Sequence, residues 1–215
     1  MKDSAVLAAK DITFGYDRTT PILDGWCATF HPGEVVAITG PSGRGKSTLL
    51  YLLGLMLRPN LGEVTIDDEN VSALGDLRRA HLRATVFGFV FQDAALDPTR
   101  TVMDNVIETA LYRGQDRREA QMRAAMLMEQ FGVDLRSTAK PGQVSGGQAQ
   151  RIALCRALLN DPRILLADEP TGNLDPASAN IVVDSFHAQA NSGSSVIVVT
   201  HDPALVARCN RQINL

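Results

Sequence analysis

The chain has 215 residues, of which 45% are hydrophobic and 21% are charged, and its net charge is −3. This length and composition allow one sizeable core with a smaller lobe attached, and they exclude a largely disordered chain. The weakly acidic balance argues against a general affinity for nucleic acid, so no nucleic-acid partner is expected.

The first third of the sequence predicts two strands, a glycine-rich loop and a helix. Val6 to Phe14 partly alternates between apolar and polar residues, and Glu34 to Thr39 is a short apolar run that ends at Gly40. Both segments predict strands. After the loop, Lys46 to Leu57 is strongly apolar and rich in helix formers, which predicts a buried helix that stops before Pro59.

The glycine-rich loop matches the phosphate-binding pattern G-x-x-x-x-G-K-[ST] between a predicted strand and a predicted helix. Glycines let backbone N–H groups point at phosphate oxygens, and the following helix adds its positive N-terminal end. Lys46 is suited to the β- and γ-phosphates, and Ser47 supplies a hydroxyl for Mg²⁺. Arg44 is long for such a loop and is expected to point outward. The motif predicts nucleotide binding by Gly40, Pro41, Ser42, Gly43, Arg44, Gly45, Lys46, Ser47 and Thr48.

The middle of the chain reads mostly as helix, from Thr101 to Phe131 and again from Gly146 to Leu159. Two clusters of side chains nearby have a structural and a functional interpretation, and the structural one is favoured for both. A solvated helix face, rather than a nucleic-acid patch, is expected for Arg78, Arg79 and Arg83. Core filling, rather than a metal site, is expected for Met103, Met122, Met126 and Met128.

The last third returns to strands alternating with helices. Arg163 to Ala167 and Ser194 to Thr200 predict strands, and a helix separates them. Such alternation predicts a mostly parallel sheet, in which ligands bind beyond the carboxyl ends of the strands. Gly40, Asp168 and His201 each follow a predicted strand, so we expect them to converge on one site.

Four polar residues at these strand ends are candidates for the chemistry. Asp168 is suited to Mg²⁺ and Glu169 to orienting and polarising a water, although two acids after a strand also suit a helix N-cap. His201 is expected to contact the γ-phosphate, with a satisfied polar residue as the alternative. Gln92 follows the apolar run Phe87 to Phe91 and is suited to Mg²⁺ or the water, but an ordinary loop glutamine fits equally.

Val144 to Arg151, read as Val-Ser-Gly-Gly-Gln-Ala-Gln-Arg, resembles the signature of ABC ATPases, usually Leu-Ser-Gly-Gly-Gln. With the phosphate loop, Gln92, the two acids and His201 in this order, the resemblance covers nearly the whole chain. Asp168 to Asp175 is most similar to the branch that contains the LolD and MacB transporters and FtsE. The resemblance implies one ABC ATPase domain of the α/β class. Its P-loop NTPase core has a mostly parallel sheet, an N-terminal antiparallel β subdomain and an inserted helical subdomain at about residues 93–150.

The resemblance also implies residue roles. Tyr16 resembles the aromatic residue that stacks on adenine, and no guanine-reading motif is evident, so ATP is the expected nucleotide. Glu169 resembles the general base, His201 the residue that senses the γ-phosphate, and Gln92 the residue that links Mg²⁺ to the membrane partner. Residues expected to act on ATP across a head-to-tail homodimer are Ser145, Gly146, Gly147, Gln148 and Asp175.

The implied function is hydrolysis of ATP with Mg²⁺, coupled to a separate membrane permease of MacB/FtsX-like type whose cytoplasmic helix docks near Gln92 to Met103. The alternative is an FtsE-like regulatory ATPase that signals across the membrane without moving cargo. Short apolar runs, no signal peptide after Met1, and three cysteines without metal-ligand spacing favour a cytoplasmic chain held on the inner face of the cell membrane by its partner. Lipoprotein, peptide, macrolide and haem all remain open as cargo.

Overall fold

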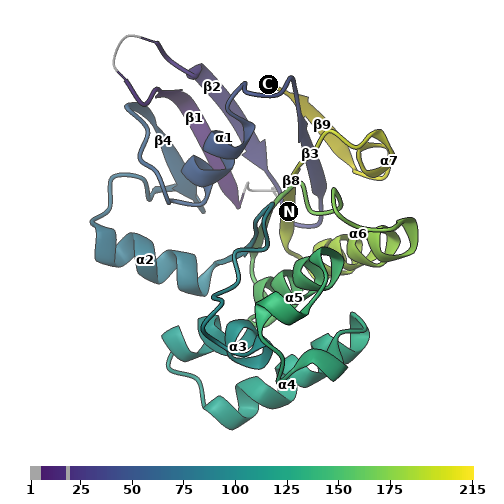
Figure 1. Cartoon of the computed structure of the whole chain (residues 1–215). Coiled ribbons are helices and arrows are strands. Elements are labelled where there is room, and N and C mark those ends of the chain that lie inside the picture. The colour runs from purple at the N-terminus through teal and green to yellow at the C-terminus, as the bar shows by residue number, and fades with distance from the viewer. Residues whose placement is uncertain (1–5, 18–19) are drawn as a thin grey trace.

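The N-terminal part of the chain forms an antiparallel sheet in the computed structural model, which describes residues 6–17 and 20–215 (Figure 1). The N-terminal residues on which the expectation about a signal peptide rests lie outside this range. The strand order is β2-β1-β4-β5. The strands are β1 (Leu7–Phe14), β2 (Leu23–Phe30), β4 (Leu61–Ile66) and β5 (Glu69–Asn70).

A second sheet has the strand order β6-β7-β8-β3-β9, and every neighbouring pair in it is parallel. The central strands β7 and β8 are buried along their whole length, as expected for a parallel sheet covered on both faces. This confirms the predicted P-loop NTPase architecture. The strands are β3 (Val35–Thr39), β6 (Phe87–Val90), β7 (Ile164–Asp168), β8 (Ser195–Val199) and β9 (Arg211–Asn214).

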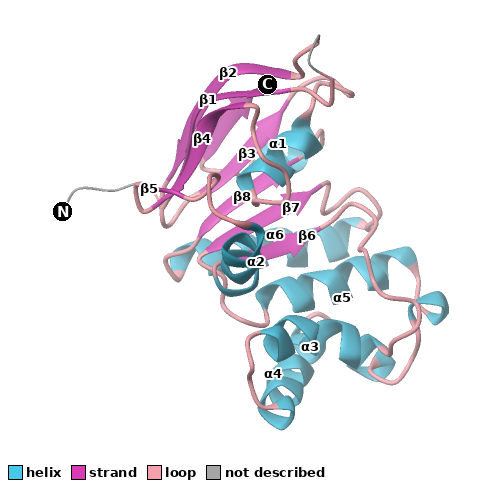
Figure 2. Cartoon of the chain, turned by 90° about the vertical axis from the view of Figure 1, so that its left-hand side faces the viewer, coloured by secondary structure: helices cyan, strands magenta, loops and turns pink. Residues whose placement is uncertain are grey.

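The helices cover the parallel sheet and extend beyond it. Figure 2 shows α3, α4 and α5 towards the opposite end of the molecule from the antiparallel sheet. No helix within the described ranges is long and apolar enough to cross a bilayer. The helices are α1 (Lys46–Leu53), α2 (Asp76–Thr85), α3 (Val102–Tyr112), α4 (Arg117–Gln130), α5 (Gly146–Leu158), α6 (Pro176–Asn191) and α7 (Pro203–Val206), with 3-10 turns at Asp134–Arg136 and Pro141–Gln143.

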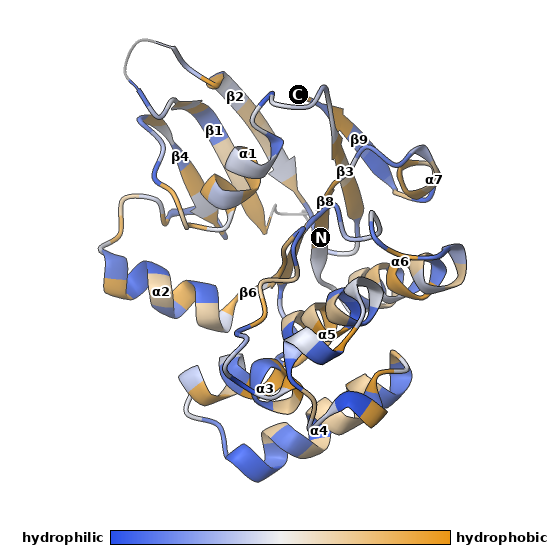
Figure 3. Ribbon diagram, viewed as in Figure 1, coloured by the Kyte–Doolittle hydropathy of each residue, from blue (hydrophilic) through white to orange (hydrophobic). Residues whose placement is uncertain are grey.

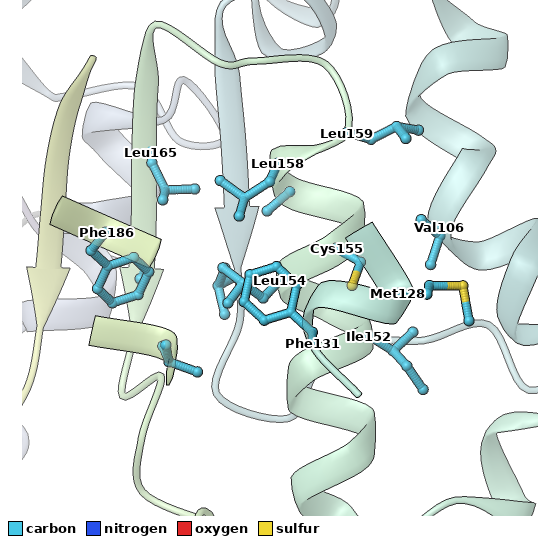
Figure 4. Close-up of a cluster of buried hydrophobic side chains, with 14 of the residues drawn as sticks. Val106, Met128, Phe131, Ile152, Leu154, Cys155, Leu158, Leu159, Leu165 and Phe186 are labelled. Carbon is cyan, nitrogen blue, oxygen red and sulfur yellow. The ribbon is translucent and has the colours of Figure 1, made fainter. Parts of the chain in front are cut away.

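The parallel strands separate two hydrophobic cores because alternate residues point to opposite faces. Ile197 and Val199 join α1 and the antiparallel sheet in one core, while Val196 and Val198 join α3, α4, α5 and α6 in the other. Figure 4 shows part of the second core, where Phe131 lies among side chains of α5, and Figure 3 shows β3 coloured as hydrophobic over most of its length. The sheet is therefore anchored on both sides, which holds its strand ends in place.

Two of the methionines expected to fill the core do not do so. Met122 and Met126 on α4 are 65% and 71% exposed, so the prediction was wrong for this pair. The helix packs instead through Ala120, Ala124 and Met128, which share the opposite face and are all buried. The small alanines let α4 approach its neighbours closely, and the larger methionines point away.

The basic cluster on α2 is not a uniformly solvated face. Arg79 is only 4% exposed, and it donates hydrogen bonds to the carbonyl oxygens of Leu55 at 2.6 Å and Leu57 at 2.8 Å. Arg83 donates to the Leu55 carbonyl at 2.8 Å, while Arg78 is exposed as expected. The predicted helix to Leu57 ends earlier because Gly54 caps α1 and Leu55 has a φ of 59°. The two arginines thus satisfy carbonyls freed where that helix stops.

Candidate functional site

A cavity of about 460 Å³ lies at the carboxyl ends of the parallel strands, within the size range of nucleotide and cofactor sites. Strands β7 and β8 and the loops after β3 and β6 each contribute to it. It brings together eleven residues predicted from the sequence, namely Tyr16, Ser42, Gly43, Gly45, Lys46, Ser47, Thr48, Gln92, Asp168, Glu169 and His201. The other two lining residues are Ile22 and Val199.

The glycine-rich loop passes through left-handed backbone conformations on its way into α1. Gly43 has a φ of 77° and Gly45 a φ of 87°. A Cβ atom at Gly45 would lie 2.3 Å from Cγ2 of Ile22, so glycine is required there for space as well as for conformation. The ammonium of Lys46 donates to the carbonyl oxygens of Gly40 at 2.9 Å and Pro41 at 3.0 Å. The loop therefore presents a positive charge together with the N-terminus of a helix.

Asp168, the last residue of β7, is 3% exposed, and its Oδ1 has no hydrogen-bond partner in the described part of the chain. Burial raises the pKa of this carboxyl, while a hydrogen bond with Ser47 and the charge of Lys46 oppose that rise. A buried carboxylate oxygen without a partner is costly, and a divalent cation would satisfy it. The donor set of Asp168 and Ser47 thus fits a hard cation such as Mg²⁺.

Glu169 follows with a left-handed φ of 44°, and its N–H donates to the carbonyl of Val199 at 2.8 Å. Its Oε2 accepts from the hydroxyl of Thr200 at 3.1 Å and from the backbone N–H of His201 at 3.3 Å. Its Oε1 lies 2.8 Å from Nδ1 of His201, an imidazole whose side chain is 76% exposed. The hydrogen bond to Glu169 and its negative charge raise the pKa of His201. The two groups therefore form a pair within the cavity.

Tyr16 and Gln92 lie exposed at the border of the cavity. The ring of Tyr16 is 70% exposed and packs edge-on against Phe14 with 5.2 Å between centroids. Its hydroxyl lies 3.5 Å from Oγ1 of Thr48. Ile22 was missed by sequence reasoning, because no local pattern marks an apolar residue as the neighbour of a loop over twenty positions away.

The signature-like segment does not line the cavity. Ser145 is the N-cap of α5, where its Oγ accepts from the N–H of Gln148 at 3.2 Å, and Gln148 Oε1 accepts from the N–H of Ser145 at 3.0 Å. A Cβ atom built at Gly146 would meet nothing within 4 Å among the described residues. The first turn of α5 thus exposes a helix N-terminus to the surroundings of this chain.

Four further predicted residues also lie outside the lining of the cavity, namely Gly40, Pro41, Arg44 and Asp175. Asp175 caps α6, accepting from the N–H of Ser178 at 3.0 Å and from its hydroxyl at 2.6 Å, and these bonds lower the pKa of its carboxyl. Arg44 is exposed, as expected for a long side chain in the loop. The geometry therefore separates a cavity formed within the chain from predicted residues that lie outside its lining.

Comparison with known proteins agrees with this geometry. A family model described as ABC transporter matches residues 23–172. The chain is 40% identical over 215 residues to "Lipoprotein-releasing system ATP-binding protein LolD" of Roseobacter denitrificans, covering 98% of this chain and 95% of that one. It is 42% identical over 213 residues to "Macrolide export ATP-binding/permease protein MacB" of Hyphomonas neptunium, covering 98% of this chain and 33% of that one.

Two solved structures are similar over nearly their whole length. The dimeric structure of MJ0796, a bacterial ABC transporter cassette, has a TM-score of 0.92 at 34% identity and covers 97% of this chain and 94% of that chain. A dimeric post-hydrolysis state of the same cassette, bound to ADP and Pi, has a TM-score of 0.88 at 33% identity with the same coverage.

Proposed function

We propose a function from one premise: the chain belongs to the ABC transporter family of ATPases. As its resemblance implied, the chain is an ATP-hydrolysing subunit, and its hydrolysis of ATP to ADP and phosphate energises a separate membrane partner. The detailed proposal depends on one observation, the cavity in which Lys46, Asp168, Glu169 and His201 meet at the ends of parallel strands.

In this proposal the cavity binds ATP. Tyr16 stacks on adenine, since its ring is exposed at the border of the cavity. The backbone N–H groups of the glycine-rich loop and the N-terminus of α1 bind the phosphates. Lys46 exchanges its two carbonyl partners for β- and γ-phosphate oxygens.

Ser47 and Asp168, with Gln92, would hold Mg²⁺. The unpartnered Oδ1 of Asp168 supports this assignment, because the buried oxygen gains a ligand there. When bound, the ion neutralises charge on the β- and γ-phosphate oxygens. Gln92 completes the group because it is the second residue after β6 and lines the same cavity.

Glu169 would act as the general base on the attacking water. Its Oε2 is held by Thr200 and by the backbone of His201, which leaves Oε1 to accept a proton. The His201 imidazole occupies that oxygen at 2.8 Å, and its exposed position leaves it room to turn towards a γ-phosphate. We propose that this turn frees Oε1 and couples nucleotide binding to activation of the base.

The exposed N-terminus of α5 would complete the site of a second copy. Ser145, Gly146, Gly147 and Gln148 form an anion site without a lysine of its own, and it lies outside the cavity of this chain. A head-to-tail dimer places it on the γ-phosphate bound by the partner, with Asp175 at the same seam. The structures of MJ0796, which are dimeric, support a dimer of such cassettes. ATP binds the closed state better than the open one, and that difference drives closure.

An apolar groove of about 950 Å³ between α2, β6 and α3 is the proposed docking surface for the permease. Phe89 of this groove lies just before the docking segment expected from the sequence, near Gln92 to Met103, and that segment stays a prediction. Leu77 and Tyr112 line it at 86% and 70% exposure, and three basic side chains, His81, Arg83 and Arg113, also line it. The occupant we propose is a short amphipathic helix of the permease that carries a carboxylate.

The partner is proposed to be a permease of MacB/FtsX-like type, which would hold this chain on the cytoplasmic face of the membrane. MacB and PvdT relatives, named as ATP-binding/permease proteins, support the pairing of such a cassette with a permease. The relatives are named for lipoprotein release or for export, which favours transport over FtsE-like signalling.

The first test is the oligomeric state of Glu169→Gln with and without Mg-ATP, measured by size exclusion. The variant is expected to bind ATP, to turn it over roughly 10²- to 10⁴-fold more slowly, and to accumulate as a dimer. Lys46→Ala is the matched control, which is expected to bind ATP poorly and remain monomeric. A monomeric Glu169→Gln beside a wild type that hydrolyses ATP unaided would contradict the dimer mechanism.

The docking groove has its own test. Leu77→Asp places a charge on an exposed apolar residue, so it is expected to leave folding and basal ATPase unchanged. It is expected to weaken binding of the permease by tenfold or more, which corresponds to about 1.4 kcal/mol or more. Leu135→Asp is the control, since Leu135 is 90% exposed but lies outside the groove. Equal permease affinity for the two variants would place the docking surface elsewhere.

A further inference from the structure

The loop that carries Gln92 is held in an unusual backbone conformation. It joins β6 to α3, and two of its residues, Ala94 and Ala95, have φ values of 60° and 45°. L-amino acids other than glycine adopt this region rarely, and they stay there only when the surroundings impose it. Some contact must therefore hold this loop in place.

That contact comes from helix α5. The guanidinium of Arg156 donates from Nη2 to the carbonyl of Ala94 at 2.8 Å and from Nη1 to the carbonyl of Ala95 at 2.7 Å. One helical turn and a half earlier, Gln150 Nε2 donates to the carbonyl of Phe91 at 3.1 Å. Gln150 and Arg156 are 3% and 9% exposed. Helix α5 thus fastens the backbone on both sides of Gln92.

The far end of the same loop is fastened to α3. Asn105, which is fully buried, accepts from the N–H of Asp97 at 2.7 Å and donates to the carbonyl of Asp97 at 3.1 Å. Between these fastenings Gln92 is exposed and lines the nucleotide cavity. The backbone around Gln92 is therefore held in place, and only the side chain of Gln92 is free to change conformation.

Arg156 is an expensive choice for a purely structural contact. Its guanidinium is buried against carbonyl oxygens, and no carboxylate lies within ion-pair distance of it in the part of the chain that the structure describes. The negative charges of Glu108 and Asp93 act on Arg156 from further away, but burial still lowers its pKa. Burying a charge that forms no ion pair costs free energy that an apolar side chain of similar size would avoid. Arg156 also lines a small cavity beside Arg83 and Phe89, both of which line the proposed docking groove. The contact therefore connects the groove, α5 and the nucleotide cavity.

We propose that Arg156 is a positioning residue that ties Gln92 to helix α5, so that the signature-like segment and Gln92 move as one unit. This rests on the role proposed above for Gln92 in the cavity. Two NH₂ groups of one planar guanidinium reach two consecutive carbonyls, and a lysine ammonium cannot reproduce that geometry. A displacement of α5 or of the groove would then be transmitted directly to Gln92.

The test is a double-mutant cycle on the ATPase of the full chain in Mg-ATP, with wild type, Gln92→Ala, Arg156→Lys and the double variant. Arg156→Lys is expected to lower kcat roughly 10- to 100-fold, the range for a catalytic group misplaced by about 1 Å, and to leave KM for ATP unchanged. The double variant is expected to be no slower than Gln92→Ala, because both changes remove the same contribution.

Arg79→Lys is the matched control. Arg79 is also buried and also donates to two backbone carbonyls, but these lie beyond the end of α1 rather than in the Gln92 loop. It is expected to lower the melting temperature about as much as Arg156→Lys and to leave kcat unchanged. If Arg156→Lys does not fold, Gln150→Met tests the same link through the carbonyl of Phe91, with a smaller fall in kcat that is likewise absent in the Gln92→Ala background.

Three results would overturn the inference. The first is a folded Arg156→Lys with the kcat of wild type. The second is a double variant whose losses multiply, which would show that Arg156 acts independently of Gln92. The third is Gln92→Ala with the rate of wild type, which would also overturn the role proposed for Gln92 and so is distinguishable from the other two.

Discussion

The start of helix α1, in the nucleotide cavity, and the start of helix α5 are both helix N-termini suited to phosphate. The two differ in the residues that surround them. At the cavity, a Cβ atom on Gly45 would lie 2.3 Å from Ile22, and Lys46 already bonds two carbonyls. At α5, a Cβ atom on Gly146 would meet nothing within 4 Å among the described residues. The first site is therefore assembled within the chain, whereas the second is a surface that another molecule must complete.

Alanine substitutions at Gly45 and Gly146 are expected to show the largest difference between the two sites. Gly45→Ala is expected to destabilise the chain by about 1–3 kcal/mol and to impair ATP binding, because it adds left-handed strain and a collision with Ile22. Gly146→Ala is expected to change stability by less than about 0.5 kcal/mol. Its turnover should nevertheless fall at least about tenfold, because the methyl group obstructs the partner's phosphate.

Thermal unfolding, ATP binding and phosphate release measured on both variants check this contrast. Gly142→Ala serves as a control, since a Cβ at Gly142 also meets nothing within 4 Å in residues 6–17 and 20–215, and Gly142 lies outside the signature-like segment. A Gly146→Ala variant with normal turnover would show that the first turn of α5 needs no close partner.

A smaller effect is expected on the pH dependence of stability, and it comes from the Glu169–His201 pair in the cavity. The hydrogen bond and charge of Glu169 raise the pKa of His201 above its ordinary value of about 6.5. The pair therefore adds stability at pH values below that ordinary value, and the addition is lost as pH rises through the raised pKa. An NMR titration of His201 should show the raised pKa in wild type and a lower one in Glu169→Gln. Equal values in the two proteins would show that the pair does not form.

The smallest effect on stability is expected for a substitution on the exposed face of α4, which belongs to neither site. Met126→Gln should change the free energy of unfolding by less than about 0.5 kcal/mol, because the side chain is largely exposed. Met128→Ala on the buried face should cost about 2–5 kcal/mol. Chemical denaturation of both variants tests which face of α4 is buried. Similar losses in the free energy of unfolding would mean that Met126 is packed in the core, as the sequence predicted.

Much of the fold was predictable because local patterns carry it. The apolar runs before Gly40, Asp168 and His201 predicted buried strands, and their alternation with helices predicted a parallel sheet whose ends converge. The cavity does gather these strand ends. The roles of the individual residues remain predictions, since a nearby position supports a role but does not demonstrate it.

Sequence reasoning failed where the partner of a side chain lies far along the chain. Arg79 was expected in solvent, yet it binds carbonyls 22 and 24 residues away. Met122 was expected in the core, but the period of apolar residues on α4 does not say which face meets its neighbours. In both cases the local sequence was compatible with either environment, and packing chose between them.

The sequence by itself determined the phosphate loop, the acids and histidine at strand ends, and the membership of a family, because these depend on short motifs and on the order of elements. Only the tertiary structure decided that Ile22 closes on Gly45, that Glu169 pairs with His201, and that Arg156 holds the Gln92 loop. The physical reason is that a motif sets backbone conformation locally, whereas the neighbours of a side chain are set by how distant segments pack.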